Sequence, residues 1–193
     1  MKSAPLAMSS LYFGTIITML IILVGLNGIA SADEPKVPTS APYIVLSDNL
    51  DEPNGYGFCL DTFGPGQSDL LHTHSCKPAK EGQPRNYAGH DARFMYDAST
   101  GRIQSYAFEG VCMQALVAKG WTVFALLNCS DHPRQKFVHN SSDGTLRLSE
   151  DKKQCVTVAD KTVPAGPWVK RPLALQECDS AKAALKRWTV VSK

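Results

Sequence analysis

The feature that most constrains this chain is a repeat of cysteine-bounded segments. Its six cysteines fall into three successive pairs, which are separated by 17, 17 and 23 residues. Further landmarks share one offset of 43 positions: Phe94 and Phe137, Gly101 and Gly144, Cys112 and Cys155. A shared offset of this kind indicates an internal repeat, which limits the possible folds more than any local pattern does. The cysteine count alone leaves 15 possible connectivities.

The first 32 residues have the features of a secretory signal peptide. Lys2 supplies a positive charge, residues 11–25 form an apolar run, and Ala30-Ser31-Ala32 is a small-residue cleavage site. We expect cleavage after Ala32, with residues 1–32 removed and the mature chain secreted, periplasmic or extracellular. The alternative is an uncleaved membrane anchor, because the apolar run extends to Ile29 and so reaches the length of about 18 residues that a helix needs to cross a membrane.

Composition favours a folded chain built from strands and turns. Of 193 residues, 44% are hydrophobic and 20% are charged, which excludes global disorder. The 14 glycines and 12 prolines suit many short strands better than a helical bundle. The net charge of +2 gives no reason to expect a nucleic-acid partner. An even number of cysteines in an exported chain predicts disulfide bonds.

Each repeat is predicted to contain about four short strands separated by turns. The third unit ends before its last strand, so Tyr43-Ile44-Val45-Leu46 is expected to supply it and to join the two ends of the mature chain in one sheet. We assign residues 181–188 to a loop. Residues 77–87 are rich in proline and lysine and are predicted to form an exposed loop.

The motifs of the three units resemble those of the ricin-type β-trefoil lectin domain. The resemblance rests on Cys59-Leu60-Asp61, on Gln135-Lys136-Phe137 and on Lys186-Arg187-Trp188. Only the first unit keeps the aspartate, and only the second keeps the glutamine. The resemblance implies an all-β fold, a β-trefoil of three repeats of about 45 residues. It would cover residues 43–193, after a short linker at residues 33–42.

The same resemblance implies that the disulfides form within each unit. The expected pairs are Cys59–Cys76, Cys112–Cys129 and Cys155–Cys178. Closing loops of this length stabilises a fold by about 3 kcal/mol each in the chain-entropy model. Phe94, Phe137 and Trp188 would then be core residues that meet near the symmetry axis.

The resemblance also implies a sugar site, which is best preserved in the first unit. Asp61 takes the place of the carboxylate that accepts sugar hydroxyl groups, and His74 the place of the stacking aromatic ring. His72 is a second polar lining residue, and Asp91 lies three positions before Phe94, where the family often has asparagine. The second and third units have Gln114 and Thr157 at the position of Asp61, so we expect both to be silent.

A metal site at His72-x-His74-x-Cys76 is an alternative, since imidazole and thiolate are zinc ligands. Against it, Cys76 is already assigned to a disulfide, so we expect neither a metal nor another cofactor. No nucleophile elbow, zinc-protease motif, phosphate loop or dinucleotide fingerprint is present in the sequence. We therefore expect no catalytic residues and no enzyme activity.

Two functions are compatible with the sequence. The first is a monomeric lectin-like module that binds a glycan or glycoconjugate and does not insert stably into a membrane after signal cleavage. The second is a β-trefoil that binds a protein, for example as a protease inhibitor, without binding sugar.

Overall fold

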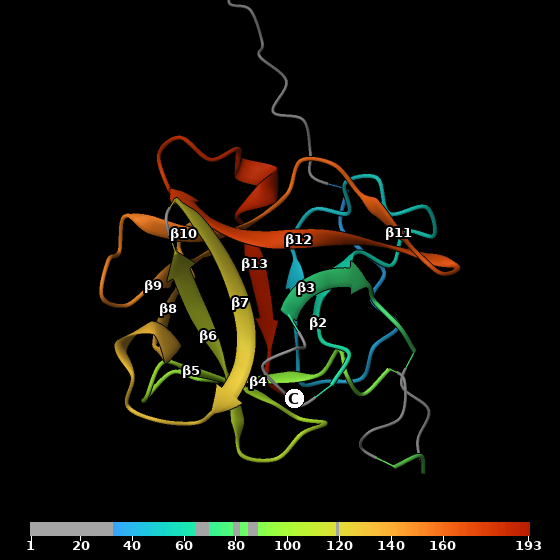
Figure 1. The fold of residues 1–193 in the computed structure, drawn as a ribbon. Helices are drawn as coiled ribbons and strands as arrows, with labels where there is room; N and C mark the ends of the chain where they lie inside the picture. Colours follow the sequence, from blue (N-terminus) through green and yellow to red (C-terminus); the bar gives the residue numbers. More distant parts are fainter. Residues whose placement is uncertain (1–32, 65–69, 79–81, 85–88, 119) are drawn as a thin grey trace, which may run out of the picture. The chain divides into compact units, whose positions relative to one another are not determined.

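The computed structural model describes residues 33–64, 70–78, 82–84, 89–118 and 120–193. The predicted signal peptide lies outside these residues. Within them the chain forms thirteen strands and two three-residue 3₁₀ helices, so the all-β prediction is confirmed (Figure 1). No helix in this part of the chain is long and apolar enough to cross a membrane.

The strands alternate with short turns along the whole described chain. Their bounds are β1 Tyr43–Leu46, β2 Phe58–Asp61, β3 Leu70–Ser75, β4 Phe94–Asp97, β5 Arg102–Ser105, β6 Val111–Ala118, β7 Trp121–Asn128, β8 Phe137–Asn140, β9 Thr145–Leu148, β10 Gln154–Val158, β11 Val163–Ala165, β12 Trp168–Glu177 and β13 Trp188–Val191. The 3₁₀ helices are η1 Pro133–Gln135 and η2 Ala183–Leu185. Helix η2 falls where a loop was predicted, because Leu185 N–H and Lys186 N–H donate to carbonyls three residues earlier.

The two ends of the described chain pair with each other, as predicted. Strands β1 and β13 are antiparallel, with Tyr43 opposite Val191 and Leu46 opposite Trp188. This pair corresponds to the β4–β5 and β8–β9 hairpins, in which Phe94 and Phe137 begin the first strand. The third unit therefore obtains its last strand from the other end of the sequence.

Backbone hydrogen bonds repeat in the same way in the three units. One set joins each of these strand pairs at its base: Ser47 N to Arg187 O, Tyr106 N to Arg93 O, and Ser149 N to Lys136 O. A second set closes each cysteine hairpin: Cys76 N to Gly57 O, Cys129 N to Gly110 O, and Cys178 N to Lys153 O. The recurrence supports the threefold repeat that the cysteine spacing suggested.

All three disulfides join cysteines of the same unit, which confirms the predicted pairing. The bonds are Cys59–Cys76, Cys112–Cys129 and Cys155–Cys178. Each disulfide joins the two strands of one hairpin: β2 with the end of β3, β6 with the end of β7, and β10 with the end of β12. The covalent links are therefore local, and contacts between units come from strand pairing and the core.

The core lies where the three units meet. Phe94, Phe137 and Trp188 are all buried in one apolar cluster, as predicted. The Trp188 indole N–H donates to Val156 O at 2.9 Å, which satisfies the one polar atom of this ring inside the core. Large buried rings at repeated positions explain how a chain with only 8% aromatic residues fills its interior.

Gly101 and its repeat partner Gly144 connect successive units. The carbonyl of Gly101 accepts from Phe137 N–H at 2.7 Å, and that of Gly144 accepts from Trp188 N–H at 2.6 Å. Gly101 has a φ of +75°, and a Cβ at this position would lie 2.8 Å from Phe137 O. A side chain here would therefore push apart the contact that joins the first two units.

Replacing Gly101 by alanine should destabilise the fold more than the same change at Gly110. Both glycines have a similar positive φ, which costs an L-residue about 1–2 kcal/mol, but a Cβ at Gly110 meets no atom within 4 Å. The clash with Phe137 O should add about 1–3 kcal/mol at Gly101 alone. Urea unfolding of both variants measures this difference. Equal losses would show that the Gly101 contact does not constrain the fold.

Candidate functional site

Strands β2, β3 and β12 lie side by side and carry most of the candidate site residues (Figure 1). Residues directly opposite one another on antiparallel strands have side chains on the same face of the sheet. Asp61 is opposite His72, while His74 is opposite Cys59 on one side and Lys170 on the other. The register thus places Asp61, His72, His74 and Lys170 on one face, although Lys170 comes from the third unit.

A lysine that was not predicted as a site residue holds the two predicted carboxylates together. Lys77 Nζ lies 2.8 Å from Asp61 Oδ2 and 2.9 Å from Asp91 Oδ2. The second oxygen of Asp91 accepts from Gly89 N–H at 2.8 Å, and Thr39 Oγ1 donates to the carbonyl of Lys77 at 2.7 Å. The prediction that residues 77–87 form an exposed loop is confirmed at residues 78 and 82–84, while residues 79–81 and 85–87 lie outside the described residues. It is wrong for Lys77, whose side chain is only 13% exposed because two carboxylates hold it inward.

Asp61 lies at the bottom of this cluster. Its side chain is only 1% exposed, and burial raises its pKa to about 7. The ammonium group of Lys77 and the backbone N–H of Thr62 act in the opposite direction, while the charge of Asp91 adds to the increase. For Lys77 itself, burial lowers the pKa, but Asp61 and Asp91 outweigh it and hold the pKa above its ordinary value. The cluster therefore keeps a charged lysine above a carboxyl group that titrates near neutral pH.

The two histidines beside this cluster are uncharged at neutral pH. Burial is the main cause that lowers the pKa of His72 to about 4; the nearby His74, Lys170 and Lys77 act in the same direction, and the hydrogen bond with the Leu70 carbonyl opposes them. Burial also lowers the pKa of His74, whose Nδ1 lies 3.9 Å from Asp61 Oδ2. Each Nδ1 is within hydrogen-bond distance of a backbone carbonyl, which can only accept, so each ring carries its proton on Nδ1.

The alternative metal site at His72-x-His74-x-Cys76 lacks its thiolate, because the sulfur of Cys76 is bonded to Cys59. Among the described residues, no group of three or more His, Cys, Asp or Glu side chains is arranged to hold a metal ion.

The corresponding position of the second unit holds a neutral group that is satisfied internally. Gln114 is buried and accepts from Gln135 Nε2 at 3.0 Å. Gln135 Nε2 also donates to Asn128 O, and its Oε1 accepts from Ser130 N–H. Gln135, the residue that best matches the family motif, therefore stabilises the second hairpin by its own hydrogen bonds.

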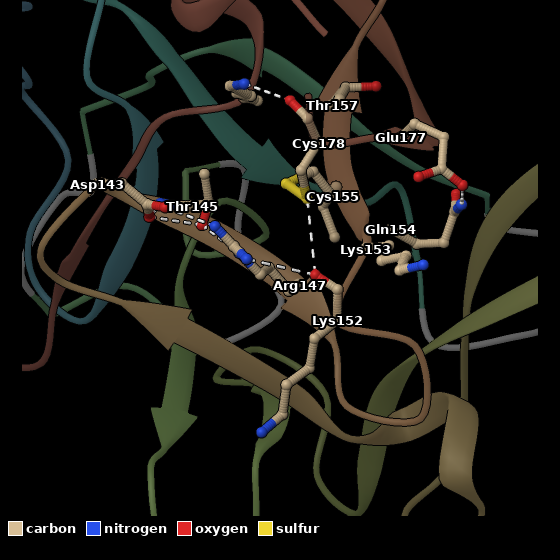
Figure 2. The surroundings of a disulfide bond; sticks show 12 residues. Asp143, Thr145, Arg147, Lys152, Lys153, Gln154, Cys155, Thr157, Glu177 and Cys178 are labelled. Carbon is tan, nitrogen blue, oxygen red and sulfur yellow. Dashed lines mark hydrogen bonds and ion pairs between the residues drawn. A yellow bond between two sulfur atoms is a disulfide. The ribbon is translucent and has the colours of Figure 1, made fainter. Parts of the chain in front are cut away.

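The third unit also differs from the first at this position. Figure 2 shows Thr157 near the Cys155–Cys178 disulfide, and Thr157 Oγ1 donates to Ala174 O at 3.4 Å. Glu177, an acidic side chain on the same hairpin, accepts from Gln154 Nε2 at 2.6 Å (Figure 2). Of the three units, only the first has a buried carboxylate at this position.

A cavity of about 330 Å³ adjoins the cluster on the His72 side. The Phe63 ring centroid lies 4.8 Å from that of His72, and Lys170 Nζ lies 5.5 Å from the Phe63 centroid. Neither Phe63 nor Lys170 was predicted from the sequence. Phe63 follows Asp61 by two positions, which could have marked it, whereas Lys170 reaches this place only through the pairing of β12 with β3.

The fold is that of the β-trefoil lectins. The C-terminal half of an earthworm R-type lectin, solved with GalNAc, matches 78% of this chain and 97% of its own, with 13% identity and a TM-score of 0.51. The β-trefoil lectin of the Vibrio vulnificus hemolysin/cytolysin, solved with N-acetyl-D-lactosamine, matches 78% and 93%, with 13% identity and a TM-score of 0.51. An mdaA-1 domain matches 85% and 98%, with 12% identity and a TM-score of 0.55. No protein-family model and no curated protein sequence matches the chain.

The titration of Asp61 should make folding stability depend on pH. Its pKa rises from 3.8 to about 7 on folding, so the folded state binds the extra proton between these values. The contribution of Asp61 to the free energy of unfolding should therefore decrease as pH rises from about 4 to about 7. His72 acts in the opposite direction, because its pKa falls on folding.

Comparison with Asp61→Asn isolates the carboxyl group from the histidines. Relative to this variant, the parent chain should lose about 4 kcal/mol of stability across the interval, at roughly 1.4 kcal/mol per pKa unit. Urea unfolding at several pH values measures the difference. Parallel pH curves for the two proteins would mean that Asp61 titrates normally.

Proposed function

We propose that this chain is an exported, non-catalytic carbohydrate-binding module whose sugar site lies in the first unit. The observation that carries the proposal is the convergence of Asp61 and Asp91 on Lys77, with His72 and His74 beside Asp61, on a β-trefoil fold. Two lectins with this fold have been solved with sugars bound, which supports the same class of ligand here.

The accessible edge of the site consists of Lys77 and Asp91. Their side chains are 13% and 16% exposed, whereas Asp61 lies beneath them. A sugar hydroxyl both donates and accepts, so it can accept from the ammonium of Lys77 and donate to Asp91. Asp61 then fixes the position of Lys77, and a hydroxyl contacts Asp61 directly only where it displaces this ammonium. His74 contributes a neutral ring beside Asp61 at the proposed sugar site.

The arrangement suits binding better than catalysis. Asp61 and Asp91 contact the same ammonium group, whereas glycoside hydrolysis requires a separate acid and base on either side of the bond that is cleaved. Three disulfides fit an oxidising compartment, consistent with cleavage after Ala32 and with a mature chain of a short linker and one trefoil domain.

Protein binding is the second candidate, and one observation favours it. Trp121 is 60% exposed at the start of β7, and Ala118, which lies opposite it on β6, is exposed as well. Tryptophan is enriched at the energetic centres of protein interfaces. This hairpin end is therefore the surface that a protein partner would contact.

Sugar binding should depend on the Lys77 cluster more than on other surface charges. Charge-assisted hydrogen bonds contribute about 1.5–3 kcal/mol, so Asp91→Asn or Lys77→Met should weaken binding roughly 10- to 100-fold. Asp61→Asn should weaken binding as well, by releasing Lys77. A glycan array with the exported protein identifies the ligand, and calorimetry then compares the variants.

Asp131→Asn is the control for these variants, because Asp131 lies in the second unit and forms exposed ion pairs with Arg102 and Lys136. It should bind sugar like the parent. If a glycan binds equally well to the parent, Asp91→Asn and Lys77→Met, the first-unit site is wrong. If no glycan binds and Trp121→Ala abolishes capture of a protein partner, the protein-binding function is correct instead.

A further inference from the structure

The cavity beside His72 has the composition of a site for a small apolar anion. Its described lining is apolar except for His72 and Lys170, and comprises Phe63, Leu70, Leu71, His72, Val123, Lys170, Pro172 and Leu173. Its volume of about 330 Å³ is at the lower end of the range of about 300–1,000 Å³ typical of ligand pockets. Sugars need several polar partners, so this lining is unsuitable for a sugar ring.

Large apolar side chains remain exposed at the mouth of the cavity. Phe63 is 64% exposed and Leu70 is 45% exposed. Exposed apolar groups around a concave site mark binding surfaces more often than isolated exposed side chains do. The His72 ring packs against Phe63 from within, so the wall of the cavity includes two neighbouring aromatic rings.

The charge beside the cavity is positive. Lys170 Nζ lies 5.5 Å from the Phe63 ring centroid, and the ion pairs found among the described residues do not include Lys170. Lys77 is the next cation, and it is already paired with Asp61 and Asp91. A half-buried lysine without a carboxylate partner, next to an aromatic ring, is a place where an anion gains both an ion pair and apolar contact.

His72 adds a polar atom that is otherwise unused. Its Nε2 is buried and has no hydrogen-bond partner among the described residues. Because Nδ1 is the donor to Leu70 O, Nε2 is an acceptor and does not compete with an anion for Lys170. The cavity therefore offers one cation, one neutral ring nitrogen and an apolar wall.

We propose that the cavity lined by Phe63, His72 and Lys170 binds a small flat apolar carboxylate, with its ring against Phe63 and its carboxylate on Lys170. This site is separate from the proposed sugar site, since the Lys77 cluster takes no part in it. The two sites share only the side chain of His72, which belongs to the wall of both.

A matched pair of probes tests the proposal: 2-naphthoate and its uncharged counterpart 2-naphthamide. Calorimetry with the exported protein should show that naphthoate binds at least about tenfold more tightly than naphthamide. Lys170→Gln should remove this preference and leave the amide affinity unchanged. Phe63→Ala should weaken both probes.

Two control variants show whether the effects are local. Lys153→Gln removes an exposed lysine of the third unit, and Met95→Ala removes an exposed apolar side chain of β4. Both should bind naphthoate like the parent. Circular dichroism of every variant confirms that the fold is retained.

Three outcomes would overturn the proposal. Equal affinity for the acid and the amide would mean that Lys170 does not select anions. Unchanged naphthoate binding in both Phe63→Ala and Lys170→Gln would place the ligand elsewhere. The third outcome combines two results: neither probe binds, and the parent chain self-associates in sedimentation experiments whereas Phe63→Ala does not. This face would then be a contact between copies of the chain. Each result is independent of the glycan array, so the sugar site is judged separately.

Discussion

The structure depends on three disulfides that each close a single hairpin. Because every bond joins cysteines separated by only 17 or 23 residues, the covalent links are formed within units and not between them. The units must then associate through backbone pairing and a shared core. Closure of this arrangement requires β1 to pair with β13, so the last strand of the third unit comes from the beginning of the fold. Because the crosslinks are local, the pairing of distant segments, β1 with β13 and β3 with β12, depends on backbone hydrogen bonds and the core.

The first disulfide also creates the geometry of the candidate sugar site. Cys76 is fixed to Cys59, and its backbone N–H donates to Gly57 O. The backbone of the next residue, Lys77, is therefore held near the beginning of β2, and its long side chain reaches Asp61 at the end of that strand. A lysine at this place changes the electrostatics of the first unit. It compensates for part of the cost of burying a carboxylate, and it puts an ammonium group where a sugar hydroxyl would otherwise approach Asp61.

Much of the fold could be predicted from the sequence because the repeat fixes several positions at once. The repeat indicated the three cysteine-bounded segments and the missing strand near Tyr43, and the resemblance to the β-trefoil lectins then implied the disulfide pairs and the core rings Phe94 and Phe137. The shared face of His72 and His74 follows from the two-residue period of a strand. These predictions rely on local spacing, and local spacing is preserved in the fold.

The parts that escaped prediction depend on contacts between units or on the path of a loop. Lys170 reaches the face of His74 only because β12 of the third unit pairs with β3 of the first. Composition alone assigned Lys77 to an exposed loop, since proline and lysine are common in such segments. The ion pairs with Asp61 and Asp91 outweighed that tendency, and no residue pattern in the sequence indicated them.

His72 lies between two environments that would favour different ligands. On one side are the carboxylates held by Lys77, and on the other is an apolar cavity beside Lys170. A charged imidazole would repel both lysines and would lose solvation without gaining a carboxylate partner of its own, since burial is the main reason that the pKa of His72 is about 4. The neutral ring can instead pack against Phe63 and keep Nε2 as an acceptor. Burial of this one side chain therefore lets a polar cluster and an apolar cavity share a wall.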